Sequence, residues 1–165
     1  MTLLVALKFV HIATLVIWCA GLLALPIMLA GDHRDQSQAE YTRLRLTLQY
    51  AYIGVVTPAA VIAVGAGTAL IFLAGVFVPW MFAKLVAVGF LVGLHGLTGH
   101  AIIAVGETPN DARLRYAVPR IVAALGLMAV TLLLVLAKPD ISLDLVPGWL
   151  RQPLALQLPL DAVPM

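Results

Sequence analysis

Four stretches of the chain contain no Asp, Glu, Lys or Arg, and they constrain the fold more than any other feature. They cover residues 9–31, 46–83, 85–106 and 121–137. A helix that crosses about 30 Å of hydrocarbon needs about 20 consecutive apolar residues. The four stretches therefore predict four membrane-spanning helices, at about 3–29, 47–74, 82–105 and 117–137.

The composition excludes most soluble classes of protein. Hydrophobic residues make up 62% of the chain and charged residues only 11%, whereas soluble domains carry about 25% charged residues. Disordered and nucleic-acid-binding proteins need more polar or basic surface than this chain has. The alternation of polar and apolar residues that is typical of β-barrel strands is absent. We expect an all-α, four-helix bundle in the lipid bilayer, formed by residues 1–138.

Two prolines predict irregularities in the second span and after it. Pro79 lies in a short turn around residues 76–80 and is expected to stop the preceding helix. Pro58 is expected to kink the second helix. Thr57, directly before it, is expected to satisfy a carbonyl that the kink frees.

Arginine and lysine predict the orientation, because cytoplasmic loops carry an excess of both. The first and third loops share a side, which holds six basic residues against four on the other. The six are Arg34, Arg43, Arg45, Arg113, Arg115 and Arg120, and the four are Lys8, Lys84, Lys138 and Arg151. We therefore expect both termini outside. In a bacterium this is a multi-pass protein of the cytoplasmic (inner) membrane with periplasmic termini.

Residues 139–165 differ from the rest of the chain. They contain too many prolines for a helix, at Pro139, Pro147, Pro153, Pro159 and Pro164. The residues between are mostly apolar, so the segment is expected to be an extended apolar tail. It either lies along the outer membrane interface or packs onto a partner subunit, because apolar chain is costly to leave in water.

Ionisable side chains inside a span are costly in lipid, so each is a functional candidate. On the first helix, His11 and Trp18 are seven residues apart and share a face, and Lys8 is one turn from His11. On the third helix, Lys84 and His95 also share a face.

Residues Val88 and Leu91 complete the stripe between Lys84 and His95, at helical spacing. His100 is five residues beyond His95, about 140° round the helix, and is expected to face elsewhere.

Histidine at this depth points to haem, because a neutral imidazole is a good axial ligand for haem iron. Lys8 and Lys84, near the outer boundary, are suited to pair with haem propionates. Room for a flat macrocycle would come from glycines near His95, namely Gly89, Gly93 and Gly96. The alternative is that each histidine hydrogen-bonds a neighbouring helix. The spacing leaves both interpretations open.

Depth argues against one iron shared by both histidines. At 1.5 Å per residue, His11 lies about 12 Å and His95 about 20 Å from the outer boundary. Ligation of one haem by both would need a tilt or a shifted boundary.

The remaining candidates carry weaker signals. Arg120, near the inner end of the fourth helix, is expected to be a snorkelling anchor rather than a catalytic group. Cys19, Met28 and His11 are soft enough for copper(I) but do not fall on one helical face. His33, in the first loop, is expected to be solvated.

Several motifs, in order along the chain, resemble the HemJ-type membrane proteins, which belong with the CopD-like group. The first helix contributes Lys8-Phe-Val-His11 and Trp18-Cys-Ala-Gly21-Leu-Leu-Ala-Leu-Pro26, and the second contributes Val56-Thr-Pro58-Ala. The third contributes Trp80-Met-Phe-Ala-Lys84-Leu and Leu94-His95-Gly96. Val118-Pro119 and Ala137-Lys138-Pro139 belong to the fourth. The resemblance covers about residues 5–140.

The resemblance implies a four-helix membrane protein that binds b-type haem. It makes His11 and His95 the leading metal ligands, with Trp18, Lys84 and Arg120 lining the cofactor site. HemJ-type proteins oxidise protoporphyrinogen IX to protoporphyrin IX, and CopD-like relatives are linked to copper uptake.

Two departures separate this chain from the family pattern. Ile27 stands where the family usually has an arginine, and Tyr116-Ala117 stands where it usually has Asn-Glu. The loss of both polar positions argues against the oxidase activity more than against the fold or the haem.

Three functions follow as hypotheses. The first is a haem b electron-transfer or accessory subunit of a larger respiratory or redox membrane complex. The second is a HemJ-like protoporphyrinogen IX oxidase that passes electrons to quinone. The third is a CopD-like copper-handling protein, or a structural subunit without a cofactor. The expected partners are lipid and other membrane subunits or further copies of the chain, with quinone or porphyrin as small molecules and no nucleic acid.

Overall fold

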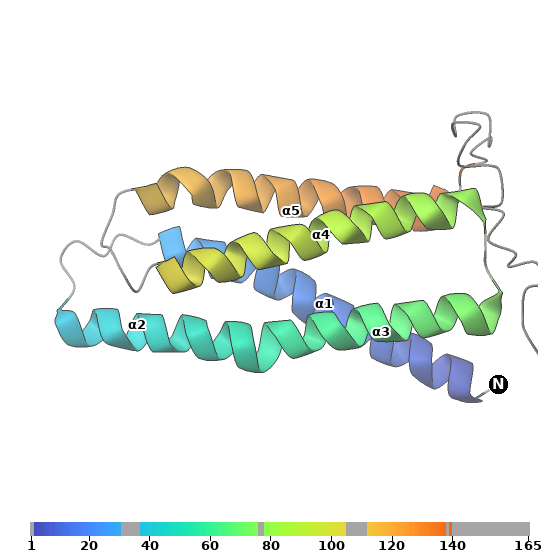
Figure 1. Ribbon diagram of the computed structural model, residues 1–165, viewed down its shortest axis with the longest axis horizontal. Coiled ribbons are helices and arrows are strands. Elements are labelled where there is room, and N and C mark those ends of the chain that lie inside the picture. The colour runs from blue at the N-terminus through green and yellow to red at the C-terminus, as the bar shows by residue number, and fades with distance from the viewer. Residues whose placement is uncertain (1, 31–36, 76–77, 105–111, 138, 140–165) are drawn as a thin grey trace, which may run out of the picture.

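The computed structural model describes residues 2–30, 37–75, 78–104, 112–137 and 139, and these form helices only. The helices are α1 (Thr2–Ala30), α2 (Gln38–Ala51), η1 (Tyr52–Val56, π-helical), α3 (Thr57–Ala74), α4 (Pro79–Ala104) and α5 (Ala112–Ala137). Because α2, η1 and α3 follow one another without a break, they form one long rod, so the described chain has four rods (Figure 1).

All four rods are long and apolar enough to cross a membrane. Large apolar side chains are exposed on every one of them; Phe9 is 73% exposed, Phe72 69% and Leu136 78%. A surface of this kind suits lipid rather than water. The predicted all-α class with four helices of membrane-spanning length is therefore confirmed for the described residues. The predicted tail from residue 140 onward, the solvated His33 and Arg34 lie outside them.

The second rod begins at Gln38, ahead of the predicted start at residue 47. Ser37 and Glu40 form a capping box there. The backbone N–H of Ser37 donates to the Glu40 carboxylate at 2.8 Å, and the Glu40 N–H donates to the Ser37 hydroxyl at 3.4 Å. This reciprocal bonding starts a helix in polar sequence, which the search for uncharged runs does not detect.

Pro79 does not stop a helix, as its sequence context predicts, but begins one. The preceding helix ends at Ala74, and Gly75 caps it with a φ of 62°, a left-handed conformation that glycine adopts without strain. Pro79 is then the first residue of α4. This position suits proline because the first turn leaves its backbone nitrogen without an intrahelical partner.

Pro58 has its effect one turn earlier, where the rod widens into a π-helix. Pro58 has no N–H to donate to Gly54, and its ring crowds that carbonyl. The N–H of Thr57 donates instead to the carbonyl of Tyr52, five residues back. The irregularity expected at Pro58 is thus a π-helical turn over Tyr52–Val56, a type of turn that often occurs at functional sites.

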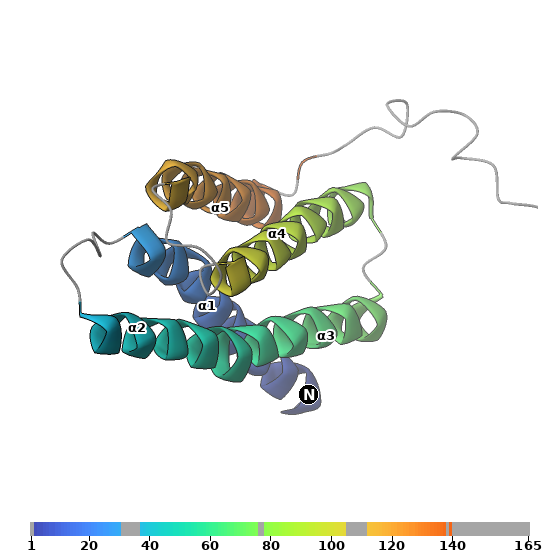
Figure 2. The same cartoon turned by 60° about the vertical axis from the view of Figure 1, so that its left-hand side comes forward.

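Helix α1 is the centre of the bundle. It packs against α3 and α5, and α5 also packs against α4. Figure 2 shows the later part of α1 between the α2–α3 rod and the α4–α5 pair, whereas its first turns extend beyond α3; the start of α1 lies at the same end of the bundle as the end of α5 in Figure 1. The face of α3 toward the core carries only small side chains, which let the helices approach closely. These buried residues are Ala59, Ala60, Ala63 and Ala66.

Candidate functional site

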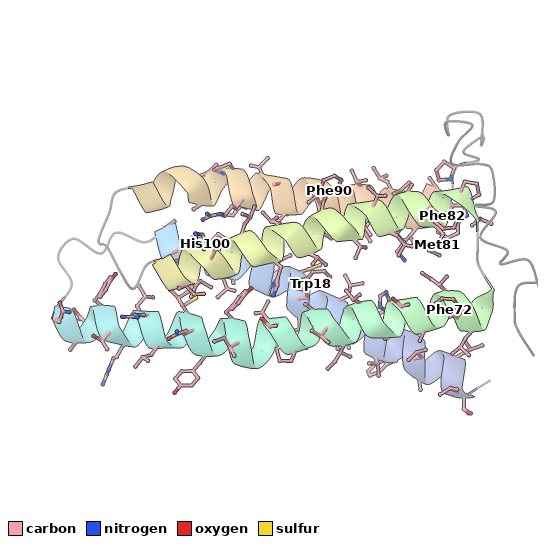
Figure 3. The ribbon with its side chains drawn as sticks, viewed as in Figure 1. Trp18, Phe72, Met81, Phe82, Phe90 and His100 are labelled. Carbon is pink, nitrogen blue, oxygen red and sulfur yellow. The ribbon has the colours of Figure 1, made fainter. Side chains whose placement is uncertain are left out.

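Trp18 and His95 meet between α1 and α4, in the middle of the bundle. Trp18 is 2% exposed, and its ring lies edge-on to the His95 imidazole, with centroids 6.2 Å apart and an interplanar angle of 81° (Figure 3 labels Trp18). The predicted stripe from Lys84 to His95 is on the packed side of α4, because its members are half-buried or buried. His100 is exposed, as predicted.

Two residues of the α2–α3 rod also contact the His95 imidazole. The Tyr52 ring stacks on it, with centroids 4.7 Å apart and an interplanar angle of 22°. The Thr57 hydroxyl lies 3.2 Å from Nε2 of His95. Thr57 is therefore bonded to the histidine rather than serving the freed carbonyl that its sequence context predicts. Tyr52 is the first residue of the π-helical turn, and Thr57 directly follows the turn.

A glycine lets Tyr52 reach the backbone of α4. The Tyr52 hydroxyl donates to the carbonyl oxygen of His95 at 3.2 Å. One turn after His95 comes Gly99, and a Cβ there would lie 2.8 Å from Cε1 of Tyr52 and closer still to its hydroxyl. A side chain at position 99 would therefore block this approach to the carbonyl.

His11 uses the same arrangement on α3. Its Nδ1 lies 2.8 Å from the carbonyl oxygen of Ala63. Gly67 follows Ala63 by one turn, and a Cβ there would lie 2.8 Å from Cε1 of His11. A carbonyl oxygen only accepts hydrogen bonds, so Nδ1 carries the proton. In the neutral imidazole, Nε2 then keeps its lone pair, and the described residues give it no hydrogen-bond partner.

The two histidines have separate surroundings. His11 bonds to α3, while His95 lies against Trp18, seven residues farther along α1 than His11. Seven residues correspond to about 10 Å along the helix axis. The two histidines therefore lie at different positions along the bundle.

The other predicted site residues occupy different parts of the bundle. Lys84 is half-buried near the start of α4, and no described residue forms a hydrogen bond or ion pair with it. Lys8 is exposed near the start of α1, at the same end of the bundle. Arg120 is half-buried on the face of α5 that also carries Ala117 and Ala124, both buried.

The glycines expected to make room beside His95 do not do so. Gly89, Gly93 and Gly96 are exposed, and nothing lies within 4 Å of a Cβ built on any of them. They are on the outward side of α4, because at about 100° per residue they lie more than 90° round the helix from the centre of the stripe that carries His95. The glycines that do meet a functional side chain are Gly67 and Gly99.

No cluster of metal-binding side chains stands out among the described residues. Within them, no three His, Cys, Asp or Glu side chains come close enough to hold an ion. An open depression of about 540 Å³ lies away from the histidines, on α2 and η1. Its lining is Arg43, Leu46, Thr47, Tyr50, Ala51 and Val55. The candidate chemistry therefore rests on the two histidines and their immediate partners.

Sequence reasoning missed Tyr52 and did not connect Thr57 with His95. The two residues are five apart, and in a regular α-helix that spacing places them about 140° from each other. The extra residue in the π-helical turn brings them closer to one face. Pro58 is the only signal of this turn, and proline more often predicts a kink.

Gly99→Ala is expected to destabilise the bundle, because its methyl group displaces Tyr52 from the His95 carbonyl. Overpacking of this kind costs about 1–3 kcal/mol in the free energy of unfolding. Gly93→Ala, on the exposed side of α4, is the matched control and is expected to be neutral or slightly stabilising. Circular dichroism during unfolding in mixed detergent–SDS micelles measures both. Equal stabilities of the two variants would contradict the close approach.

Comparison of the chain with models of protein families, with curated proteins and with solved structures finds no match in any of the three. The resemblance to HemJ-type and CopD-like proteins therefore rests on the sequence motifs alone.

Proposed function

We propose that the chain spans a bacterial cytoplasmic membrane, binds one b-type haem through His11, and serves as an electron-transfer or accessory subunit of a larger redox membrane complex. The observation that carries this proposal is the fixed imidazole of His11, whose Nδ1 is held by the Ala63 carbonyl. Histidines that ligate a metal almost always donate their other ring N–H to a carbonyl or carboxylate.

The donor set of His11 fits haem iron. Nε2 is the atom left to ligate, and His11 is a half-buried residue of a helix long and apolar enough to span a membrane. The Ala63 carbonyl sets the tautomer and the ring orientation, so the ligand is ordered before it binds. Haem held there would supply a one-electron iron couple.

Two lysines at the same end of the bundle support this placement. Lys8 is one helical turn from His11, and Lys84 is near the start of α4, at the same end of the bundle. Their ammonium groups suit the two propionates of haem, which leave the hydrocarbon most easily near the boundary. Orientation with both termini in the periplasm, as the basic residues predict, would place this haem in the outer half of the membrane.

We assign the iron to His11 and not to His11 and His95 together. His11 is held by Ala63 and His95 by Thr57, and these two residues are six apart on α3, which is about 9 Å along the helix axis. Trp18 packs against His95 rather than His11 and so would not line a haem on His11.

The two alternatives have less support from the site. Protoporphyrinogen oxidation is the HemJ-like alternative. The two positions at which that family usually carries polar residues hold the apolar Ile27 and Ala117 here, so neither offers a polar group. Copper handling is the CopD-like alternative. Copper(I) needs converging soft ligands, and among the described residues no three His, Cys, Asp or Glu side chains converge.

An absorbance spectrum of the purified full chain tests the proposal. We expect a reduced b-type α-band and a pyridine haemochrome assay that gives one haem per chain. His95→Ala should keep this haem. A haem-free chain after expression with excess haem precursor would overturn the proposal, and loss of haem in His95→Ala would show that His95 is also a ligand.

Co-purification tests the role as a subunit. If the apolar tail binds a partner, quinol oxidase or dehydrogenase subunits should co-purify with the full chain and be lost when it is truncated after Pro139. Rescue of a strain that lacks protoporphyrinogen oxidase would instead support the enzymatic alternative.

A further inference from the structure

Two buried polar atoms at the centre of the bundle have no hydrogen-bond partner among the described residues. They are Nε1 of Trp18 and Nδ1 of His95. Buried polar groups are nearly always satisfied, and in a membrane no bulk water can reach them. Both atoms belong to neighbouring rings, so one missing partner would account for both.

Neither ring is free to turn and find another partner. Tyr52 stacks on the His95 imidazole, and Thr57 holds its Nε2. Trp18 is 2% exposed and tightly enclosed. The two rings are direct neighbours, with centroids 6.2 Å apart and an interplanar angle of 81°.

The hydrogen-bonding roles of the two nitrogens define the partner that they lack. The indole N–H of Trp18 can only donate, so the missing atom must accept. When Nε2 of His95 donates to Thr57, Nδ1 carries a lone pair and needs a donor. A water molecule is the smallest group that accepts one hydrogen bond and donates another.

We propose that Trp18 and His95 bind one internal water molecule between α1 and α4. The water completes a chain of hydrogen bonds from Thr57 through His95 to Trp18, and so joins three helices at the π-helical turn. Both nitrogens are closed off from the surface, so this water exchanges only when the rings move apart. The site is independent of the haem on His11 and would remain if no haem bound.

A high-resolution crystal structure of the full chain in a lipid mesophase tests the site directly. We expect a water peak within hydrogen-bond distance, about 3 Å, of both Nε1 of Trp18 and Nδ1 of His95. A direct contact between the two nitrogens, an empty gap or a metal atom on Nδ1 would each overturn the proposal.

Ultraviolet resonance Raman spectroscopy tests it in detergent solution, because the indole bands respond to hydrogen bonding of the N–H. The spectrum of Trp18→Phe subtracted from that of the wild type isolates Trp18, and Trp80→Phe provides the matched control. We expect a hydrogen-bonded indole N–H for Trp18 in the wild type. His95→Ala should shift this band, and a free N–H in the wild type would refute the bound water. A Trp18→Phe variant that fails to fold leaves the crystallographic test decisive.

Discussion

His11→Ala is expected to abolish haem binding by the purified chain. The reduced α-band should disappear. Haem affinity should fall by more than the roughly 100-fold that can follow from loss of one hydrogen bond to a ligating histidine. The reason is that His11 offers the only ring nitrogen among the candidates that is both free and oriented by a backbone carbonyl. Haem titration followed by absorbance measures the effect.

His100→Ala is the matched control for this experiment. His100 is an exposed histidine on α4, outside the packed stripe, and its removal should leave the haem spectrum unchanged. If His11→Ala keeps its haem while the fold is intact by circular dichroism, the assignment of the iron to His11 is wrong.

Gly67→Ala is expected to weaken haem binding although it leaves His11 in place. The added Cβ would lie 2.8 Å from Cε1 and 3.2 Å from Nδ1 of the imidazole, so the ring must move away from the Ala63 carbonyl. Loss of an outer-shell hydrogen bond to a ligating histidine lowers affinity by about 10–100-fold. The same titration compares the dissociation constants of wild type and variant.

Gly65→Ala separates this effect from a general change in the helix. Gly65 lies on the same helix, is exposed, and has nothing within 4 Å of a Cβ built on it. It should bind haem as the wild type does. Equal affinities for the two glycine variants would show that the contact between His11 and Gly67 does not orient an iron ligand.

Much of the helical framework could be predicted from the sequence. The uncharged runs predicted four helices of membrane-spanning length, because the length of a span follows from the thickness of hydrocarbon. The stripe from Lys84 to His95 predicted the packed side of α4, because helical periodicity places these residues in line. The ends of helices that depend on polar capping, as at Ser37, were predicted less well.

The candidate site was predicted in part. His11, Trp18 and His95 were selected from the sequence because polar and ionisable groups are rare in apolar spans. The sequence did not connect them with their partners. Glycines beside His95 in the sequence turned out to face outward, and the glycine that accommodates His11 is on another helix.

The sequence by itself determined the apolar character of the long helices, their number in the described chain and the side of α4 that packs, since these depend on composition and on spacing within one helix. Only the tertiary structure decided that His11 bonds to Ala63, 52 residues away, and that Thr57 bonds to His95, 38 residues away. Such pairs depend on the rotation and register of one helix against another. Here a π-helical turn and two absent side chains, at Gly67 and Gly99, decide that register, and neither effect is visible in the hydrophobic pattern.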